Sequence, residues 1–139
     1  MNKSKELDRI ADKEKITIMD TKCPECGSIS HMTINGNCYI GIDDSKRMTK
    51  EELNVHKAHE IGHCVEGAFY NKYAKYDIIS KHEYRADRWA IKKLIPKDEL
   101  IEAFENNILE TWHLAEHFEV TEEFMIKALE FYGYYHRAI

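Results

Sequence analysis

Apolar and polar residues follow a strand-like pattern in the first third of this chain. Three short runs are rich in β-prone residues: Ile16 to Met19, Ile29 to Ile34 and Asn37 to Ile42. Asn35-Gly36 joins the last two runs, and this dipeptide is typical of the turn between two antiparallel strands. Before them, Ser4 to Lys15 has apolar residues at helical spacing, which predicts a short surface helix. The first third is therefore predicted to form a helix and a small antiparallel sheet.

From residue 49 onwards the apolar residues recur every three or four positions, which predicts α-helices. Thr49 and Glu52 have the spacing of a capping box, so a long helix begins there. A second helix carries Ser80 to Ala90 and ends at Pro96, because proline lacks a backbone N–H and clashes with the preceding turn. Three further helical segments follow: Asp98 to Glu105, Glu110 to Phe118 and Glu122 to Tyr135, the last capped by Thr121. Together these elements predict an α+β fold, in which the small antiparallel sheet packs on a helical core.

The length of 139 residues and the hydrophobic content of 43% suit a single domain. Its expected parts are residues 1–48 with the first helix and the sheet, 49–96 with two long helices, and 97–139 with the C-terminal helices. No apolar run approaches the roughly 20 residues of a membrane span. Because no apolar segment follows the charged first residues, as it would in a secretory signal, we expect a cytoplasmic protein. The net charge of -5 argues against direct nucleic-acid binding.

The strongest chemical signal is the segment His59-Glu60-Ile61-Gly62-His63. Residues four apart lie on one face of a helix, so the two histidines can ligate one zinc ion while Glu60 acts as the general base. Because histidine is abundant in this chain, two solvated or packed histidines are the alternative. A glycine inside a helix costs about 1 kcal/mol. Close packing of another backbone against Gly62 would explain its presence there.

A catalytic zinc site needs a third protein ligand, which we expect from the next helix. Glu83, 20 residues after the second motif histidine, is the best placed carboxylate. The alternative is that Glu83 closes a capping box with Ser80, and Glu66 or His82 are weaker ligand candidates. Asp87 lies four residues after Glu83 and is suited to accept the second N–H of a zinc-bound histidine. A solvated carboxylate is the alternative for Asp87.

These two segments resemble the ImmA/IrrE family of small bacterial zinc metallopeptidases, which belongs to the gluzincins. The second motif of that family is matched by Glu83, Ala86, Ala90, Leu94 and Pro96, with Trp89 where phenylalanine is usual. The resemblance covers about residues 37 to 132, and related gluzincin motifs favour Asp87 as the carboxylate behind a ligand. It implies a cytoplasmic zinc peptidase that cleaves one site in a transcriptional repressor of the same phage or mobile element.

Cys23 and Cys26 form a Cys-x-x-Cys pair followed by Gly27, which is half of a zinc knuckle. No second pair with this spacing follows, so a structural zinc at this pair is one hypothesis beside free thiols in a turn and a redox dithiol. In a cytoplasmic protein we expect all four cysteines to be thiols or metal ligands. Cys64, directly after the zinc motif, is predicted to be a small buried apolar residue.

Four residues near the connection between the motif helices are candidates for stabilising the oxyanion of a peptidase reaction: Tyr73, Tyr76, His82 and Tyr84. Ordinary packing or surface exposure is the alternative for the tyrosines. Asn37 to Ile42 is a candidate edge strand for holding an extended peptide by main-chain hydrogen bonds.

Together these residues predict a zinc metallopeptidase with one catalytic Zn²⁺ and a protein substrate, and without a membrane partner. The alternative from another class is a non-catalytic zinc-binding regulatory or protein-interaction module. That module would have a closed site with four ligands and would tolerate Glu60→Gln. A nucleic-acid-associated factor built on Cys23 and Cys26 is a third hypothesis, which the acidic composition disfavours.

Overall fold

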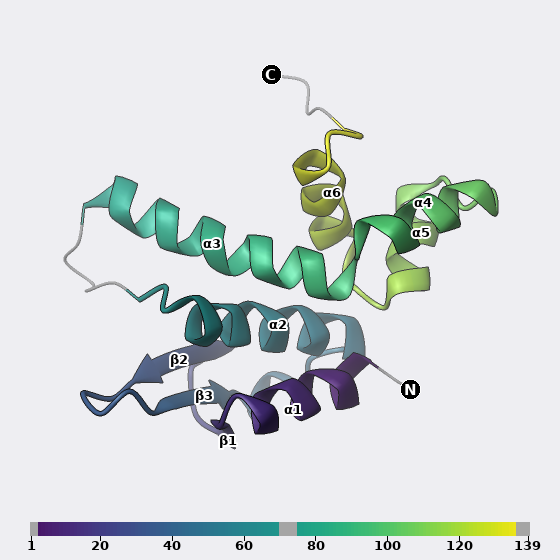
Figure 1. Ribbon diagram of the computed structural model, residues 1–139. Coiled ribbons are helices and arrows are strands. Elements are labelled where there is room, and N and C mark those ends of the chain that lie inside the picture. The colour runs from purple at the N-terminus through teal and green to yellow at the C-terminus, as the bar shows by residue number, and fades with distance from the viewer. Residues whose placement is uncertain (1–2, 70–74, 136–139) are drawn as a thin grey trace.

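The computed structural model describes residues 3–69 and 75–135, and within them a three-stranded sheet lies against a stack of helices (Figure 1). The elements run in the order α1 (Lys3–Lys13), β1 (Ile16–Asp20), β2 (Ser28–Met32), β3 (Cys38–Ile42), the short 3-10 helix η1 (Asp44–Lys46), α2 (Lys50–Glu66), α3 (Tyr76–Leu94), α4 (Lys97–Glu105), α5 (Thr111–Phe118) and α6 (Glu122–Phe131). The fold is therefore α+β, as the sequence pattern predicts.

The sheet has the strand order β1-β3-β2, and its two pairings differ in direction. β2 and β3 are antiparallel, as predicted, with Ser28 opposite Ile42 and Met32 opposite Cys38. β1 pairs parallel with β3, so the prediction of a purely antiparallel sheet is wrong. The physical reason is the apolar character of β3, which is buried at four of its five positions. A strand covered on both faces belongs in the centre of a sheet, and β3 accordingly lies between the other two.

Helix α2 occupies the centre of the structure, between the sheet and α3 (Figure 1). It begins with the predicted capping box, in which the Thr49 hydroxyl accepts from the Glu52 N–H and the Glu52 carboxylate accepts from the Thr49 N–H. Gly62 lies directly against α3, since a Cβ placed on it would be 2.7 Å from the carbonyl oxygen of Ala86. The predicted close packing at Gly62 is thus confirmed, and it lets side chains of α2 and α3 reach one site.

Gly62→Ala is expected to destabilise the protein by about 1–2 kcal/mol. The added methyl group would have to displace the backbone of α3, and this overpacking outweighs the gain of about 1 kcal/mol in helix propensity. Urea denaturation followed by circular dichroism measures the free energy of unfolding. Val65→Ala, at an exposed position of the same helix, is the control and should change it by less than about 0.5 kcal/mol. Unchanged stability of Gly62→Ala would contradict the close contact.

Helix α3 begins one turn earlier than its sequence suggests. Its first residue is Tyr76 and its N-cap is Lys75, so Ser80 lies inside the helix and does not form the alternative capping box with Glu83. Asp77 in the first turn interacts favourably with the helix dipole, which supports this earlier start. The helix ends at Leu94, shortly before Pro96, as predicted. Glu83 is consequently a mid-helix residue whose carboxylate is available to α2.

The three C-terminal helices are close to their predicted positions. The Thr121 hydroxyl caps α6 as predicted, by accepting the Phe124 N–H. Helix α6 ends at Phe131 instead of Tyr135, because Gly133 adopts a φ of 83° that a helix cannot continue. One hydrophobic cluster joins these helices to the rest of the structure and includes Leu7, Ile40, Ile61, Leu94, Phe118 and Met125. None of the described helices has the length and apolar content needed to cross a membrane.

All four cysteines are paired in disulfides, so the prediction of thiols or metal ligands is wrong. Cys23 is bonded to Cys26, and a disulfide sulfur is no thiolate ligand, which leaves the structural zinc hypothesis without its donors. Cys38 at the start of β3 is bonded to Cys64 of α2, and both are buried. Packing of α2 on the sheet brings their Cα atoms to 6.0 Å, a usual disulfide distance. Their separation in the sequence gives no sign of this approach.

Candidate metal centre and active site

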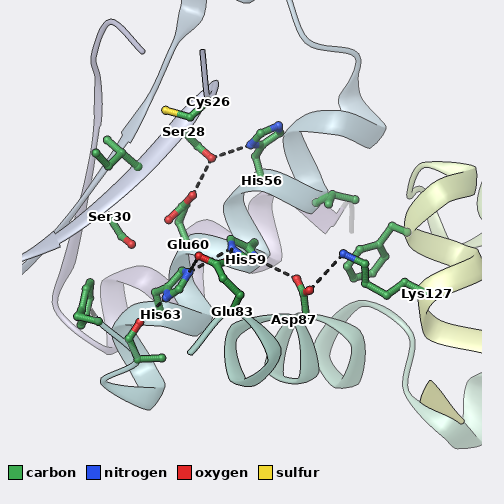
Figure 2. Close-up of a pocket in the computed structure, with 15 residues that line it drawn as sticks. Cys26, Ser28, Ser30, His56, His59, Glu60, His63, Glu83, Asp87 and Lys127 are labelled. Atoms are coloured by element: carbon green, nitrogen blue, oxygen red, sulfur yellow. Dashed lines mark hydrogen bonds and ion pairs between the residues drawn. The ribbon is translucent and has the colours of Figure 1, made fainter. Parts of the chain in front are cut away.

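Two histidines of α2 and one glutamate of α3 converge on one point (Figure 2). The Nε2 atoms of His59 and His63 are 3.1 Å apart. The Glu83 carboxylate lies 2.8 Å from His59 Nε2 and 3.4 Å from His63 Nε2. All three donor atoms lie within 4.8 Å of one another. The structure thus brings together the three residues that were predicted as ligands.

This donor set fits a metal ion with an open coordination position. Two imidazole nitrogens and one carboxylate oxygen are a ligand set of catalytic zinc sites, which keep a fourth position for water or substrate. All three residues line one cavity of ≈ 590 Å³, so that fourth position would be accessible. Among the described residues, His59, His63 and Glu83 form the group whose spacing suits a metal ion.

Each histidine is oriented by an acceptor at its other ring nitrogen. His59 Nδ1 lies 2.8 Å from an oxygen of Asp87, and His63 Nδ1 is hydrogen-bonded to the carbonyl oxygen of Ala68. Both Nδ1 atoms therefore donate a proton, so each Nε2 atom is the one that would bind a metal once its own proton is lost. Lys127 of α6 binds the second oxygen of Asp87 at 3.1 Å. As the sequence predicts, Asp87 accepts the N–H of the histidine nitrogen that faces away from the candidate metal position.

Two carboxylates, those of Glu83 and Asp87, contact His59 at this centre. Burial lowers the pKa of His59, but hydrogen bonds to the carboxylates of Asp87 and Glu83 outweigh it and raise this pKa to about 10. Burial raises the pKa of Asp87, while the contacts with His59 and Lys127 lower it below its usual value. The carboxylates therefore favour positive charge at this point, whether a proton or a metal ion carries it.

Asp87→Asn is expected to weaken zinc binding by about 10- to 100-fold, because a neutral amide no longer supports the Nδ1–H of His59 as a carboxylate does. Competition with a fluorescent chelator measures the zinc affinity. Asp77→Asn, at an exposed position of the same helix, is the matched control and should bind zinc as the wild type does. Equal affinities of the two variants would mean that Asp87 does not support the site.

The predicted general base, Glu60, lies in the same cavity and is only 6% exposed. Ser28 of β2 donates a hydrogen bond of 2.8 Å to its Oε2 atom. The Ser28 hydroxyl also lies 2.6 Å from Nδ1 of His56, one turn earlier on α2. Sequence analysis missed both residues. The spacing of four between His56 and Glu60 was a usable signal, whereas nothing in the sequence connects Ser28 with them.

Three of the four predicted oxyanion-stabilising residues can be located, and none of these three lines the cavity. Tyr73 lies outside the described residues. Tyr76, His82 and Tyr84 are absent from the described residues that line the cavity. Tyr76 is 84% exposed at the start of α3, and the Tyr84 ring packs against Phe131. A helix turns about 100° per residue, so the neighbours of Glu83 point away from the direction that Glu83 takes.

The wall of the cavity opposite α3 is formed by strand β2. Ile29 and Ser30 of this strand line the cavity, together with the apolar side chains of Val55, Phe69 and Phe124. The prediction that Asn37 to Ile42 is an edge strand for a substrate is wrong. These residues contain β3, which is the central strand and is paired on both sides. β2 is an edge strand of this sheet, and it is the strand next to the candidate metal centre.

The helix with two histidines, the carboxylate from the next helix and the buried glutamate form an arrangement that fits a site of the metallopeptidase type. Residues 13–130 match the family profile described as Peptidase M78, IrrE N-terminal-like domain. Since this match covers most of the chain, the protein belongs to that family, and the resemblance seen in the sequence is confirmed. Searches of curated proteins and of solved structures gave no significant match.

Proposed function

We propose that this protein is a zinc-dependent endopeptidase that hydrolyses a peptide bond in a protein substrate. The observation that carries this proposal is the buried carboxylate of Glu60 beside three converging donor atoms in one open cavity. A module that binds zinc only for structure needs neither an accessible cavity nor a carboxylate at its wall. Membership in a peptidase family supports the same proposal.

His59, His63 and Glu83 would hold the zinc ion. A zinc ion bound there supplies a Lewis acid, which lowers the pKa of a water molecule to about 7 and polarises the scissile carbonyl. Glu60 accepts a proton from the attacking water and later donates it to the nitrogen of the leaving amine. Asp87 and the Ala68 carbonyl keep both histidine rings in the orientation that binding requires.

The substrate would lie along β2 in an extended conformation. An edge strand has unpaired N–H and C=O groups that can pair with the backbone of a peptide. β2 is such a strand, and its residues Ile29 and Ser30 face the cavity. The apolar side chains of Val55, Phe69 and Phe124 would then accommodate apolar side chains of the substrate.

We further propose that the substrate is a transcriptional repressor of a phage or other mobile element, cleaved at one site. This part rests on the resemblance of the two motifs to the ImmA/IrrE peptidases. In this role the protein would act in the cytoplasm on a folded or partly folded partner.

The test is a search for new peptide termini. The zinc-loaded protein is incubated with a library of peptides derived from a bacterial proteome, and separately with purified repressors encoded beside its gene. Mass spectrometry then identifies each cut, with Glu60→Gln as the inactive reference. Cuts made only by the wild type support the proposal, and a cut in a repressor supports its specific form. The same termini with both proteins, or none with either, would overturn it.

A further inference from the structure

Ser28 bridges two residues of α2 across the interface between the sheet and the helix (Figure 2). Its hydroxyl lies 2.6 Å from Nδ1 of His56 and 2.8 Å from Oε2 of Glu60. Ser28 and Glu60 are each only 6% exposed, so a hydrogen bond within the protein is important for the Glu60 carboxylate. A buried carboxylate without a donor is strongly unfavourable, and the Ser28 hydroxyl supplies that donor.

The proton positions follow from the number of donors. A serine hydroxyl has one proton, and Ser28 gives it to the Glu60 carboxylate, which has none to offer. The contact with His56 is then a hydrogen bond only if the imidazole donates from Nδ1. Burial lowers the pKa of His56, which favours the neutral ring, and the contact with Ser28 then requires the ring proton on Nδ1. The chain of donors therefore runs from His56 through Ser28 to Glu60.

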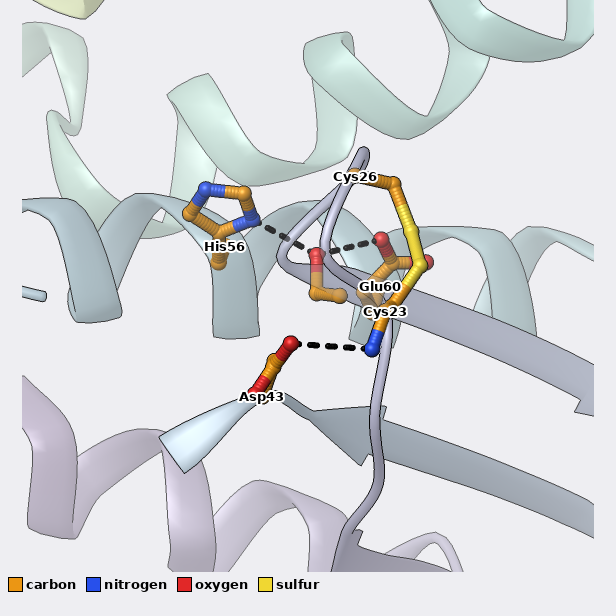
Figure 3. The surroundings of a disulfide bond; sticks show 6 residues. Cys23, Cys26, Asp43, His56 and Glu60 are labelled. Atoms are coloured by element: carbon orange, nitrogen blue, oxygen red, sulfur yellow. Dashed lines mark hydrogen bonds between the residues drawn. A yellow bond between two sulfur atoms is a disulfide. The ribbon is translucent and has the colours of Figure 1, made fainter. Parts of the chain in front are cut away.

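Hydrogen bonds and a disulfide hold residues 23–27, the segment before Ser28, in place (Figure 3). The Cys23 N–H donates to the buried carboxylate of Asp43 at 2.9 Å, and the Asp43 N–H donates to the Gly27 carbonyl at 2.8 Å. Gly27 has a φ of 78°, and a Cβ there would lie 3.2 Å from the His56 ring. Together with the Cys23–Cys26 disulfide, these contacts hold Ser28 beside His56.

We propose that Ser28 and His56 are positioning residues for the general base. They hold Oε2 of Glu60 through a directed chain of two hydrogen bonds and leave Oε1 for the reacting water and the leaving amine. The inference rests on the proposed peptidase function. Without Ser28, the Glu60 side chain samples other rotamers and its carboxylate is displaced from the geometry that proton transfer requires.

The first test reads the proton positions and requires no substrate. In the ¹⁵N-histidine NMR spectrum of the zinc-loaded wild type at pH 7.5, His56 should be the neutral Nδ1–H tautomer, with its signals assigned by their loss in His56→Asn. In Ser28→Ala the preference for Nδ1–H should disappear, because its acceptor is gone. Ser80→Ala is the control, because Ser80 is on α3 and is not part of this chain of hydrogen bonds, and it should leave the tautomer unchanged. An Nε2–H tautomer in the wild type would overturn the inference.

The second test reads catalysis with the peptide that the wild type cleaves best. Ser28→Ala should lower kcat by about 10- to 100-fold with KM and zinc content near wild type. His56→Asn places an amide N–H where Nδ1 lies and should retain most of kcat. The longer side chain in His56→Gln places its amide beyond that point, so this variant should lose more of kcat. Equal losses in the two His56 variants, or a kcat of Ser28→Ala within twofold of wild type, would overturn the inference.

The two tests separate this inference from the proposed function. If the wild type cleaves no peptide, the peptidase proposal fails, and the tautomer of His56 still decides whether the chain of hydrogen bonds exists. If the wild type is active and only the predicted tautomer is missing, the peptidase proposal stands and the positioning role is refuted.

Discussion

Glu60→Gln is expected to lower the rate of peptide cleavage by about 100- to 10,000-fold while the protein keeps its zinc. This is the usual contribution of a general acid–base group. Glutamine has nearly the shape of glutamate and can still accept the hydrogen bond from Ser28, but its amide cannot take a proton from water. The zinc content should not change, because Glu60 is outside the group of three converging donors.

The measurement is kcat/KM for one cleaved peptide, together with zinc per chain from elemental analysis. Glu66→Gln is the matched control on the same helix, since Glu66 contacts Arg85 at the end of α2 and does not line the described cavity. It should retain wild-type activity. Residual activity of Glu60→Gln within tenfold of wild type would assign the base to another residue, and loss of zinc would place Glu60 among the ligands.

Glu83→Ala is expected to lower the zinc affinity by at least about 100-fold. Loss of a residue that hydrogen-bonds to a metal ligand typically lowers the metal affinity by about 10- to 100-fold. Loss of a ligand itself should therefore lower the affinity by at least the upper end of this range. The two imidazoles that remain cannot complete a catalytic zinc site, which has three protein ligands. Since His59 and His63 also lose the charge that faces their Nε2 atoms, the site becomes less favourable for any cation.

Zinc stoichiometry after dialysis and chelator competition measure this effect. Glu66→Ala removes the carboxylate that was a weaker candidate for the third ligand, and it should keep one zinc per chain. The double variant Cys23→Ser/Cys26→Ser should also keep one, because the pair is a disulfide in the structure. Zinc retained in Glu83→Ala and lost in the cysteine variant would refute the metal centre described above.

The two candidate metal ligands of α2 could be predicted because their geometry is local. A spacing of four places His59 and His63 on one face of any helix, whatever surrounds it. The capping box at Thr49 and the stop at Pro96 are equally local, and both are found as predicted. Glu83 required one further step, a third ligand from the next helix, and its approach depends on the contact between Gly62 and Ala86.

Contacts between distant segments could not be predicted in this way. Ser28 and Glu60 are 32 positions apart, and Asp87 and Lys127 are 40 apart, so no local pattern links them. The cysteines show the same limit, since Cys38 and Cys64 become partners only when α2 packs on the sheet. Tyr76 and Tyr84 were chosen because they lie in or near the connection between the motif helices, yet Tyr76 is exposed at the start of α3 and the Tyr84 ring packs against Phe131.

By itself, the sequence determined the α+β class, most helix boundaries and the His59–His63 pair, because these depend on periodicity or spacing within one segment, and its two motifs indicated the family. Only the tertiary structure decided the strand order, which makes β2 the edge beside the cavity, and the partners that orient Glu60 and His63. Strand pairing and buried hydrogen bonds are settled by the packing of the whole core, where residues far apart in the chain compete for the same space.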